Sequence, residues 1–225
     1  MRLLWAYVFA ILPSPVKRRL GRWLHGWAID RSAHIGISVI QVGKLTMGPG
    51  TFIGGRNVIT HLDVLRLDEG SSIGPGNRIK GWWQVPDPNE QLANRRPELI
   101  LGDFAQISAD HRLDCVDRIE LGKYAAIGGF RSTVLTHSLD IARDRYTSAP
   151  VVLGDYAAVL SGCTLLPGSR VPSRSIVSAG SVVATRLESE LTFYRGNPAE
   201  AVRDLPPTLA YFRRGAIAPG VDEPA

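Results

Sequence analysis

The sequence predicts an all-β protein whose body is a parallel β-helix, and the main observation is a period of six residues. An aliphatic residue recurs at every sixth position from 153 to 183, at Leu153, Val159, Leu165, Val171, Val177 and Val183. A helix has a period near 3.6 residues and a strand a period of two, so neither alone explains this spacing. Short strands joined by tight turns and stacked coil upon coil do explain it, with the aliphatic residue pointing into the core.

Two further observations support the same fold. The fifth place of each complete unit holds a small residue, which we expect to face inward at a corner: Ala157, Cys163, Ser169, Ser175 and Ser181. The spacing of six also occurs earlier in the chain, in blocks at 47–65, 67–79, 101–119 and 121–133. The register slips by two after Leu65 and after Ile119, and we interpret each slip as a corner that holds extra residues.

The chain begins with an apolar run over residues 3–12, followed by the basic cluster Lys17, Arg18, Arg19 and Arg22. The run is much shorter than the roughly 20 residues that span a bilayer. The basic cluster follows it, whereas in a signal peptide the basic residues come first. Two interpretations stay open: a helix that packs on the protein or a neighbouring subunit, and an interfacial anchor in residues 1–22. Aromatic residues and basic residues of this kind suit the surface of an anionic membrane.

The bulk composition limits the classes of partner. A chain of 225 residues suits one domain with small appendages. The net charge of +5 is modest and partly local to the basic cluster, so nucleic acid is not an expected partner. Cys115 and Cys163 do not make a disulfide framework, and we expect both to be reduced thiols in a cytosolic protein.

Two stretches interrupt the repeat, and both are expected to leave the coil as loops. The first, Gly81 to Glu98, contains Trp82 and Trp83; the second runs from Leu135 to Pro150. Loops on a rigid scaffold often carry binding sites. The two tryptophans either stack on a sugar ring, wedge against a neighbouring subunit, or pack on their own coil.

The end of the chain departs from the repeat after Ala184. Residues 194–199 predict a turn, and Pro207 to Arg214 predicts a short helix that caps the open end of the solenoid. The expected organisation is an N-terminal helical segment over 1–30, the β-helix over 31–188, and a C-terminal turn, helix and tail over 189–225.

Four motifs carry a resemblance to a known family: residues 135–140 (LTHSLD), 150–155 (PVVLGD), 179–183 (AGSVV) and 196–199 (GNPA). With these motifs in matching order and spacing, residues from about 30 to 203 resemble the left-handed β-helix, hexapeptide-repeat acyltransferases. They resemble especially the O-acetyltransferase branch, which includes maltose and galactoside acetyltransferases and many polysaccharide-modifying enzymes. The resemblance implies a homotrimer, acetyl-CoA as donor and active sites between two subunits. From the reduced cysteines and the N-terminal segment, the expected location is the cytoplasm, free or peripheral at the inner face of the membrane.

Acetyl transfer to a hydroxyl needs a base for its proton and donors for the tetrahedral oxyanion. The resemblance makes His137 the general base, and a histidine is largely neutral at cellular pH, as this role requires. Asp140 is a nearby carboxylate in sequence and a candidate to orient the ring. A rival assignment makes His111 the base, because serine acetyltransferases carry an Asp-His pair one coil earlier.

The resemblance also implies binding residues. Asp110, His111 and Asp114 are expected to bind the acceptor, with a solvated turn as the alternative. Trp82 and Trp83 of the first loop are further acceptor-binding candidates. Those expected to bind coenzyme A are Ser161, Ala179 and Gly180 in the groove and Arg203 and Arg186 at the phosphates. Two positions depart from the family's Val-Trp-Ile-Gly stretch: Ala158 replaces the aromatic residue and Leu160 replaces the glycine. We expect these changes to alter the wall of the donor groove. Cys163 is a poor candidate for an acyl-enzyme nucleophile, so direct attack in a ternary complex is expected.

The leading acceptor is a hydroxyl of a sugar, glycan or glycolipid. One alternative is N-acylation of an amino sugar, free or linked to a nucleotide, and another is a β-helix scaffold without activity. A γ-type carbonic anhydrase would need three histidines around a metal. The five histidines here include no pair with a spacing of three to five, so no metal site is expected.

Overall fold

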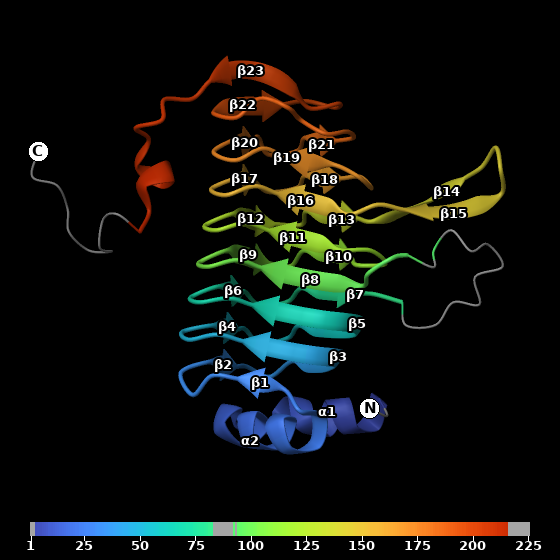
Figure 1. The fold of residues 1–225 in the computed structure, drawn as a ribbon, viewed down its shortest axis with the longest axis vertical. Helices are drawn as coiled ribbons and strands as arrows, with labels where there is room; N and C mark the ends of the chain where they lie inside the picture. The colour runs from blue at the N-terminus through green and yellow to red at the C-terminus, as the bar shows by residue number, and fades with distance from the viewer. Residues whose placement is uncertain (1–2, 83–91, 93, 216–225) are drawn as a thin grey trace, which may run out of the picture.

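The computed structural model describes residues 3–82, 92 and 94–215. Figure 1 shows a column of stacked coils with two helices at one end and a hairpin that projects from its side. Within the described residues the strands form two sheets, parallel throughout except for the last strand of one, and a separate antiparallel hairpin. The predicted β-helix is therefore confirmed.

Each coil has three sides, and the sides stack into three faces. The first face holds the first parts of β3 (Val39–Met47) and β5 (Val58–Leu67), then β7 (Arg78–Lys80), β10 (Arg112–Asp114), β13 (Thr133–Leu135), β18 (Thr164–Leu165) and β21 (Val182–Val183). The second face holds β1 (Ala28–Ile29), the later parts of β3 and β5, β8 (Glu98–Leu101), β11 (Ile119–Leu121), β16 (Val151–Leu153) and β19 (Arg170–Val171). The third face holds β2 (His34–Ile35), β4 (Phe52–Ile53), β6 (Ser72–Ile73), β9 (Gln106–Ala109), β12 (Ala126–Phe130), β17 (Ala158–Val159), β20 (Ile176–Val177) and β22 (Thr192–Arg195).

The core is a stack of the aliphatic residues that define the repeat. Leu165 pairs in register with Val183, and Val159 with Val177, so these coils take 18 residues each. All four side chains are fully buried. Burying one such side chain stabilises the fold by about 1.5–3 kcal/mol, so the repeated aliphatic positions supply the driving force for coiling.

The interpretation of the register slips was wrong. Leu65 and Leu67 lie within the single strand β5, and Ile119 and Leu121 lie within β11, with all four side chains at most 1% exposed. Residues two apart on a strand point to the same side, so each of these strands supplies two inward side chains. The slip therefore falls inside a strand of the second face and not at a corner.

The small residues at the fifth positions line the corners from the inside, as expected. Each of the five is at most 1% exposed. Cys115 and Cys163 are free thiols, and burial raises the pKa of both. A raised pKa keeps a thiol protonated and makes it a poor nucleophile.

The N-terminal segment forms two helices, α1 (Leu3–Ile11) and α2 (Ser14–His25), separated at Pro13 and ended at Gly26 in a left-handed conformation. Ala6, Phe9 and Ala10 are buried, and the Phe9 ring meets the Trp27 ring edge-on at 5.6 Å between centroids. Packing on the body of the protein, one of the two open interpretations, is therefore confirmed for this segment.

The basic cluster caps the open edge of the first coil. Lys17 donates from Nζ to the carbonyl oxygens of Gly36 at 2.6 Å and Ile35 at 3.4 Å. Arg18 donates to the Ala33 carbonyl oxygen at 2.8 Å, and Arg22 to that of Ile29 at 3.2 Å. A coil at the end of a solenoid lacks a neighbour on one side, so these side chains take the place of the missing strand.

Part of the helical cap stays exposed. Tyr7, Val8 and Ile11 of α1 and Trp23 and Leu24 of α2 are between 44% and 81% exposed. None of the helices in the described part of the chain has the length and apolar character needed to cross a membrane. Membrane contact through residues 1–22 stays a prediction.

The opposite end is capped differently from the expectation. β22 turns back through Asn197 and Pro198 into the antiparallel strand β23 (Glu200–Asp204), which lies over the last coil in Figure 1. The short helix η2 (Ala210–Arg213) runs down the side of the column, where Tyr211 donates to the Tyr124 carbonyl oxygen at 3.4 Å. A strand can cover the unpaired sheet edge because its backbone N–H and C=O groups form hydrogen bonds with the edge strand, whereas those of a helix are bonded within the helix.

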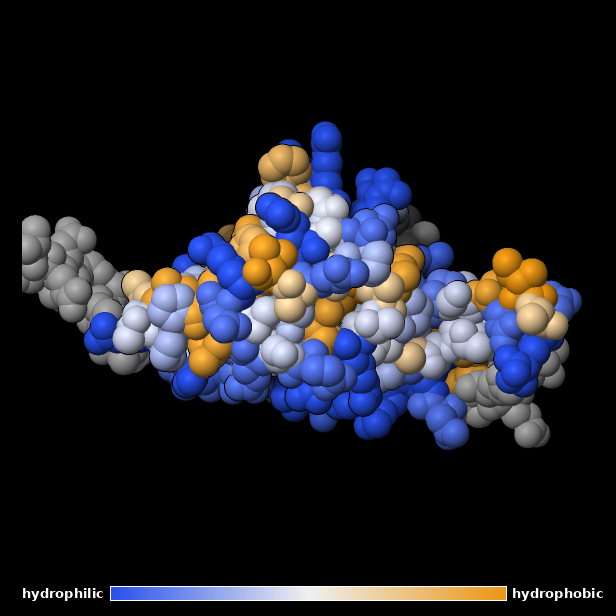
Figure 2. Space-filling model, turned by 90° about the horizontal axis from the view of Figure 1, so that it is seen from above, coloured by the Kyte–Doolittle hydropathy of each residue, from blue (hydrophilic) through white to orange (hydrophobic). Residues whose placement is uncertain are grey.

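The second irregular stretch leaves the column at the corner between the first and second faces, which we call the hairpin corner. The first stretch begins at the same corner after β7, and the loop predicted there lies mostly outside the described residues, at 83–91 and 93. The second stretch is not a loop: β14 (His137–Asp140) and β15 (Arg145–Ser148) form an antiparallel hairpin. Leu139 and Ile141 are 46% and 86% exposed on it, and apolar side chains gather at the hairpin end of the molecule in Figure 2. The hairpin was missed because its residues follow no clear alternation of polar and apolar types.

The Lys17→Met substitution tests the cap. It removes the donor to two edge carbonyls, and we expect the free energy of unfolding to fall by about 1–3 kcal/mol. Lys44→Met on β3, where the side chain is exposed, is the matched control and should change stability by less than about 0.5 kcal/mol. Urea denaturation of the three proteins measures this, and equal effects of the two substitutions would contradict a capping role.

Candidate active site

The hairpin corner brings together side chains that lie far apart in the sequence. Asp114 ends β10, and in the next coil it pairs with Leu135, which ends β13. His137 opens the hairpin two residues after Leu135. Trp82 follows β7, which pairs with β10 on its other side. Three successive coils therefore deliver their side chains to one place.

The central contact joins His137 to Asp114. The Asp114 carboxylate oxygen Oδ2 forms a hydrogen bond with Nδ1 of His137. The two side chains are 25% and 20% exposed, so the pair is sheltered but open to solvent. A carboxylate on Nδ1 fixes the ring orientation and leaves Nε2 as the proton acceptor.

Asp140, the carboxylate suggested by sequence proximity, lies elsewhere. Its Oδ2 accepts a hydrogen bond from Arg143 at 2.9 Å within the hairpin turn. The hydrogen bonds from Arg143 are the main cause that lowers the pKa of Asp140. The partner of His137 is thus one coil earlier in the stack rather than three residues later in the chain.

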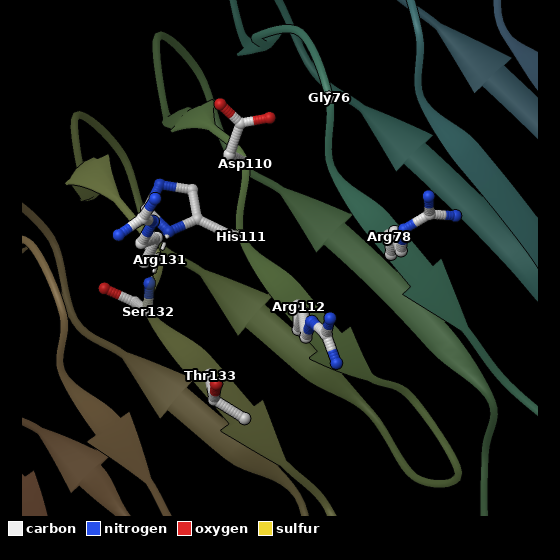
Figure 3. Close-up of a pocket in the computed structure, with 8 residues that line it drawn as sticks. All are labelled: Gly76, Arg78, Asp110, His111, Arg112, Arg131, Ser132 and Thr133. Carbon is white, nitrogen blue, oxygen red and sulfur yellow. Dashed lines mark hydrogen bonds between the residues drawn. The ribbon is translucent and has the colours of Figure 1, made fainter.

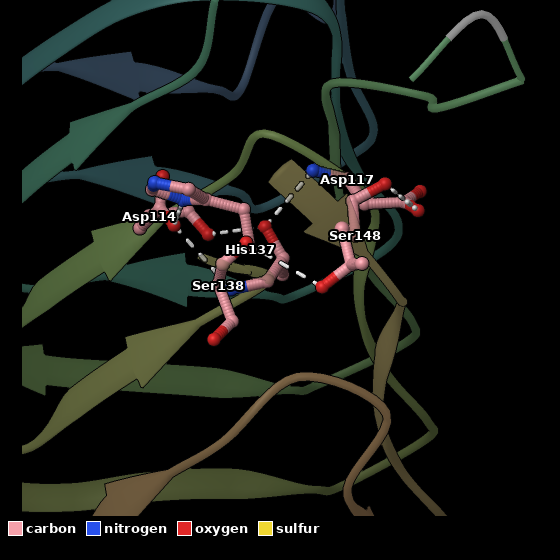
Figure 4. A network of polar contacts seen from close by, with 7 residues as sticks. Asp114, Asp117, His137, Ser138 and Ser148 are labelled. Carbon is pink, nitrogen blue, oxygen red and sulfur yellow. Dashed lines mark hydrogen bonds and ion pairs between the residues drawn. The ribbon is translucent and has the colours of Figure 1, made fainter. Parts of the chain in front are cut away.

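A hydrogen-bond network holds the pair in place. Thr136 donates from Oγ1 to the Asp114 carbonyl oxygen at 2.7 Å and accepts from the Asp117 backbone N–H at 2.9 Å. Ser148, at the end of the hairpin, donates to the Asp117 carboxylate at 3.2 Å. Figure 4 shows Asp114 and Asp117 tied in this way to the start and the end of the hairpin. The geometry of His137 is therefore coupled to that of the hairpin.

Two aromatic rings flank the imidazole. The Trp82 ring lies 4.9 Å from the His137 ring between centroids, and the Tyr146 ring lies 6.0 Å from Trp82. Trp82, one of the residues expected to bind the acceptor, thus lies beside His137, whereas Trp83 lies outside the described residues. Tyr146 was not predicted, because only the pairing of β14 with β15 brings it to the histidine.

His111 belongs to a different structure, a column of side chains at the corner between the third and first faces that we call the polar ladder. Its members are Ser38, Asn57, Asn77, His111, Ser132 and Cys163. In each step from Ser38 to Ser132 a side chain accepts a hydrogen bond from the backbone N–H of the next member. His111 accepts through Nδ1 from Ser132 N–H at 3.1 Å and is 1% exposed.

The environment of His111 disfavours its charged form. Burial lowers the pKa of His111 to about 4, against the smaller opposing effects of Asp110 and the Gly129 carbonyl. The ring is neutral near pH 7, and its Nδ1 lone pair is already occupied by the ladder.

His111 and Asp110 also line a cavity of about 450 Å³ at this corner, shown in Figure 3. Its other lining residues are Gly76, Arg78, Arg112, Arg131, Ser132 and Thr133. Two of the five expected acceptor residues are therefore together here, and Asp114 and Trp82 are together at the hairpin corner. Both places border the first face.

The residues expected to bind coenzyme A are spread over the upper coils. Ser161 and Gly180 lie on successive coils near the polar ladder, joined by a hydrogen bond from Gly180 N–H to the Ser161 carbonyl at 2.9 Å. Ala179 and Gly180 are exposed, and a side chain added at Gly180 would point into open space. The backbone of Arg186 forms an isolated parallel β-bridge with that of Arg170 on the second face. The Arg203 guanidinium on β23 lies over the Phe193 ring, 5.1 Å from its centroid.

The described residues contain no group of three or more histidine, cysteine, aspartate or glutamate side chains that could hold a metal ion. The short distances at the hairpin corner join one histidine to one carboxylate, which is an arrangement for proton transfer.

No family model and no curated protein matches the sequence. Among solved structures, the chain is similar to a hexapeptide-repeat-containing acetyltransferase of Vibrio cholerae, with 17% identity over 91% of this chain and 90% of that one and a TM-score of 0.54. The structure of the same enzyme complexed with acetyl coenzyme A, from Vibrio cholerae O1 biovar eltor, matches at 23% identity over 63% of this chain and 71% of that one, with a TM-score of 0.51. The polySia-specific acetyltransferase NeuO matches at 14% identity over 79% of this chain and 80% of that one, with a TM-score of 0.47. The two Vibrio cholerae structures show that this chain has the left-handed β-helix fold of hexapeptide-repeat proteins.

The His111→Asn substitution tests the assignment of this histidine to the polar ladder. Asn57 and Asn77 occupy equivalent rungs, so asparagine should accept from Ser132 N–H and keep the fold. In the natural chain the unfolded state binds a proton near pH 6.5 and the folded state only near pH 4. Stability due to His111 is therefore lost as the pH falls from about 6.5 to about 4, by up to about 3 kcal/mol.

Chemical denaturation at pH 7 and pH 4.5 measures this difference. The substituted protein should lose markedly less stability between the two pH values than the natural one. An identical loss in both proteins would mean that His111 does not titrate as a buried neutral ring.

Proposed function

We propose that the chain is an acetyl-CoA-dependent acyltransferase in which His137 is the general base for attack of a sugar hydroxyl on the thioester. The observation that carries this proposal is the Asp114 carboxylate on Nδ1 of a part-exposed imidazole, on the fold of hexapeptide-repeat acetyltransferases. In sequence, the motif around His137 resembles the O-acetyltransferase branch.

In the proposed reaction Asp114 keeps the proton on Nδ1 and stabilises the imidazolium that forms. Nε2 of His137 takes the proton of the acceptor hydroxyl as its oxygen attacks the thioester carbonyl carbon. The tetrahedral intermediate then collapses, the carbon–sulfur bond breaks, and the imidazolium returns the proton to the leaving thiolate. The products are the acetyl ester and coenzyme A, and no covalent enzyme intermediate is needed.

The contrast between the two histidines supports His137 as the base. A general base works best when its pKa lies near the working pH and its lone pair is open to the substrate. His111 has a pKa of about 4, is almost fully buried and uses Nδ1 in the polar ladder. The His137 side chain is 25% exposed, and it contacts Asp114 through Nδ1, so Nε2 is not used by this contact.

For the donor, the acetyl coenzyme A complex of the Vibrio cholerae enzyme supports the same co-substrate here. The exposed Ala179 and Gly180 and the neighbouring Ser161 offer a path without bulky side chains for the pantetheine arm. In one protomer these residues and His137 lie at opposite edges of the first face. A site shared between two subunits of a homotrimer, which the sequence resemblance implies, would bring a donor path to the histidine of a neighbour.

The first test is incubation of the full chain with acetyl-CoA and a panel of neutral sugars, acidic sugars, amino sugars and lipid-linked saccharides, followed by release of free thiol. Sugar-dependent thiol release supports the proposal. Alkali-labile product indicates O-acetylation, and alkali-stable product indicates the alternative N-acylation. Acetyl-CoA binding by calorimetry without turnover on any acceptor would favour a scaffold, and a failure to bind acetyl-CoA would overturn the proposal. Assembly as a trimer, a cytoplasmic location and membrane contact remain predictions.

The His137→Ala and Asp114→Asn substitutions test the catalytic pair. We expect each to lower kcat by about 10²–10⁴-fold, because one removes the base and the other its orienting charge. Asp140→Asn is the matched control, since its carboxylate binds Arg143 instead, and it should leave kcat within about twofold. Steady-state kinetics on the best acceptor decides between these outcomes. A large effect of Asp140→Asn, or none of Asp114→Asn, would contradict the assignment.

The Trp82→Ala substitution tests acceptor stacking beside His137. Loss of the ring removes an apolar platform for a sugar face, and we expect kcat/KM for the acceptor to fall about tenfold. Trp82→Phe keeps a ring and should restore most of the loss. An unchanged acceptor KM with an intact fold would show that Trp82 only packs on its own coil.

A further inference from the structure

Three arginines and one aspartate line the cavity beside the polar ladder, so its lining has an excess of positive charge. We propose that Arg78, Arg112 and Arg131 form a binding site for a phosphate or carboxylate group, and that this group belongs to the acceptor. The inference rests on the proposed function only for the second part, because anion binding is measurable without turnover.

The three guanidinium groups come together through coil stacking. Arg112 on β10 is the direct register partner of Arg78 on β7, so their side chains project side by side from neighbouring strands. Arg131 stands at the turn before β13, where its backbone N–H donates to the Asp110 carbonyl oxygen at 3.3 Å. Figure 3 shows the three side chains around one hollow, with Asp110 and His111 at its edge.

All three arginines are exposed, and Arg78 and Arg112 place like charges opposite each other on neighbouring strands. Like charges directly opposite each other on neighbouring strands repel. In the described part of the chain none of the three forms an ion pair with a carboxylate, and Arg131 lies over the Phe130 ring at 5.8 Å. The one carboxylate that lines the cavity belongs to Asp110. With His111 neutral, three arginines and one aspartate leave an excess of two positive charges.

Arginine suits such a site better than lysine does, because its planar fork of donors matches the oxygens of a phosphate or carboxylate. The cavity volume of about 450 Å³ leaves room for such a group together with part of a sugar ring. The Asp110 side chain lies against Gly76, and a side-chain carbon at position 76 would collide with Asp110 Oδ1. Asp110 is thereby placed to accept hydrogen bonds from sugar hydroxyls beside the anion.

The position of the cavity connects it to the catalytic pair. Arg112 and Asp114 are two residues apart on β10 and point to the same side of the strand, about 7 Å apart along it. The anion site and the His137–Asp114 pair therefore border one open face. An acidic sugar or sugar phosphate has its charge about this far from its reactive hydroxyls, so we infer an anionic saccharide as the acceptor class.

The first experiment measures binding of inorganic phosphate and of glucuronate by NMR titration of the full chain. Arg112→Gln should weaken binding about tenfold, since it removes a charge-assisted hydrogen-bond donor. Arg56→Gln is the matched control: it stands at the same corner, is exposed and lies outside the cavity. No binding of either probe, or equal weakening by the two substitutions, would overturn the anion site.

The second experiment separates the acceptor from the donor, whose phosphates are also anions. If the acceptor carries the anion, Arg112→Gln should raise KM for an acidic sugar about tenfold and leave the Kd for acetyl-CoA unchanged. A weakened Kd for acetyl-CoA with an unchanged acceptor KM would overturn the acceptor assignment and give the site to the donor. If no sugar is acetylated by the natural chain, the proposed function fails, whereas the phosphate titration still decides whether the anion site exists.

Discussion

The structure depends on one constraint: every coil takes its backbone hydrogen bonds from the coils above and below it. A parallel stack of this kind fixes which residue lies over which, because each pair must be in register along the strand. Leu165 therefore lies over Val183, and Asp114 lies beside Leu135. The same constraint leaves unpaired backbone groups at both ends. The protein covers one end with arginine and lysine side chains of α2 and the other with the returning strand β23.

The corners of the stack have different uses. At the polar ladder, side chains such as Asn57 and Asn77 accept the N–H groups that the turn leaves over, so polar atoms are satisfied inside a tightly packed corner. At the corner between the second and third faces, Phe104, Tyr124 and Tyr156 stack with centroids 4.9 and 5.0 Å apart and support the C-terminal segment. The hairpin corner releases chain from the stack, and for that reason it is the corner where side chains gather into an accessible site.

Two histidines on this scaffold illustrate how position decides chemistry. His111 is a rung of the polar ladder, and burial holds it neutral down to about pH 4. His137 stands just outside the stack, with a carboxylate on one nitrogen and aromatic rings beside it. The residue type is the same, but the His137 side chain is 25% exposed whereas His111 is 1% exposed. The site proposed for proton transfer thus lies where the coil is interrupted, whereas the polar ladder lies at a corner where the coil is continuous.

The sequence by itself determined the fold, because the period of six and the small fifth residues are local patterns that each coil repeats. It also indicated His137 and Trp82, since a motif and an interruption of the repeat mark them. Only the tertiary structure decided that Asp114, and not Asp140, orients His137, because coil stacking brings together residues 23 positions apart. The caps, the hairpin and the group of three arginines were likewise decided in three dimensions. Each depends on which backbone groups remain unpaired, or on which side chains become neighbours across coils. Neither property can be predicted from the six-residue pattern, because both depend on how the coils stack.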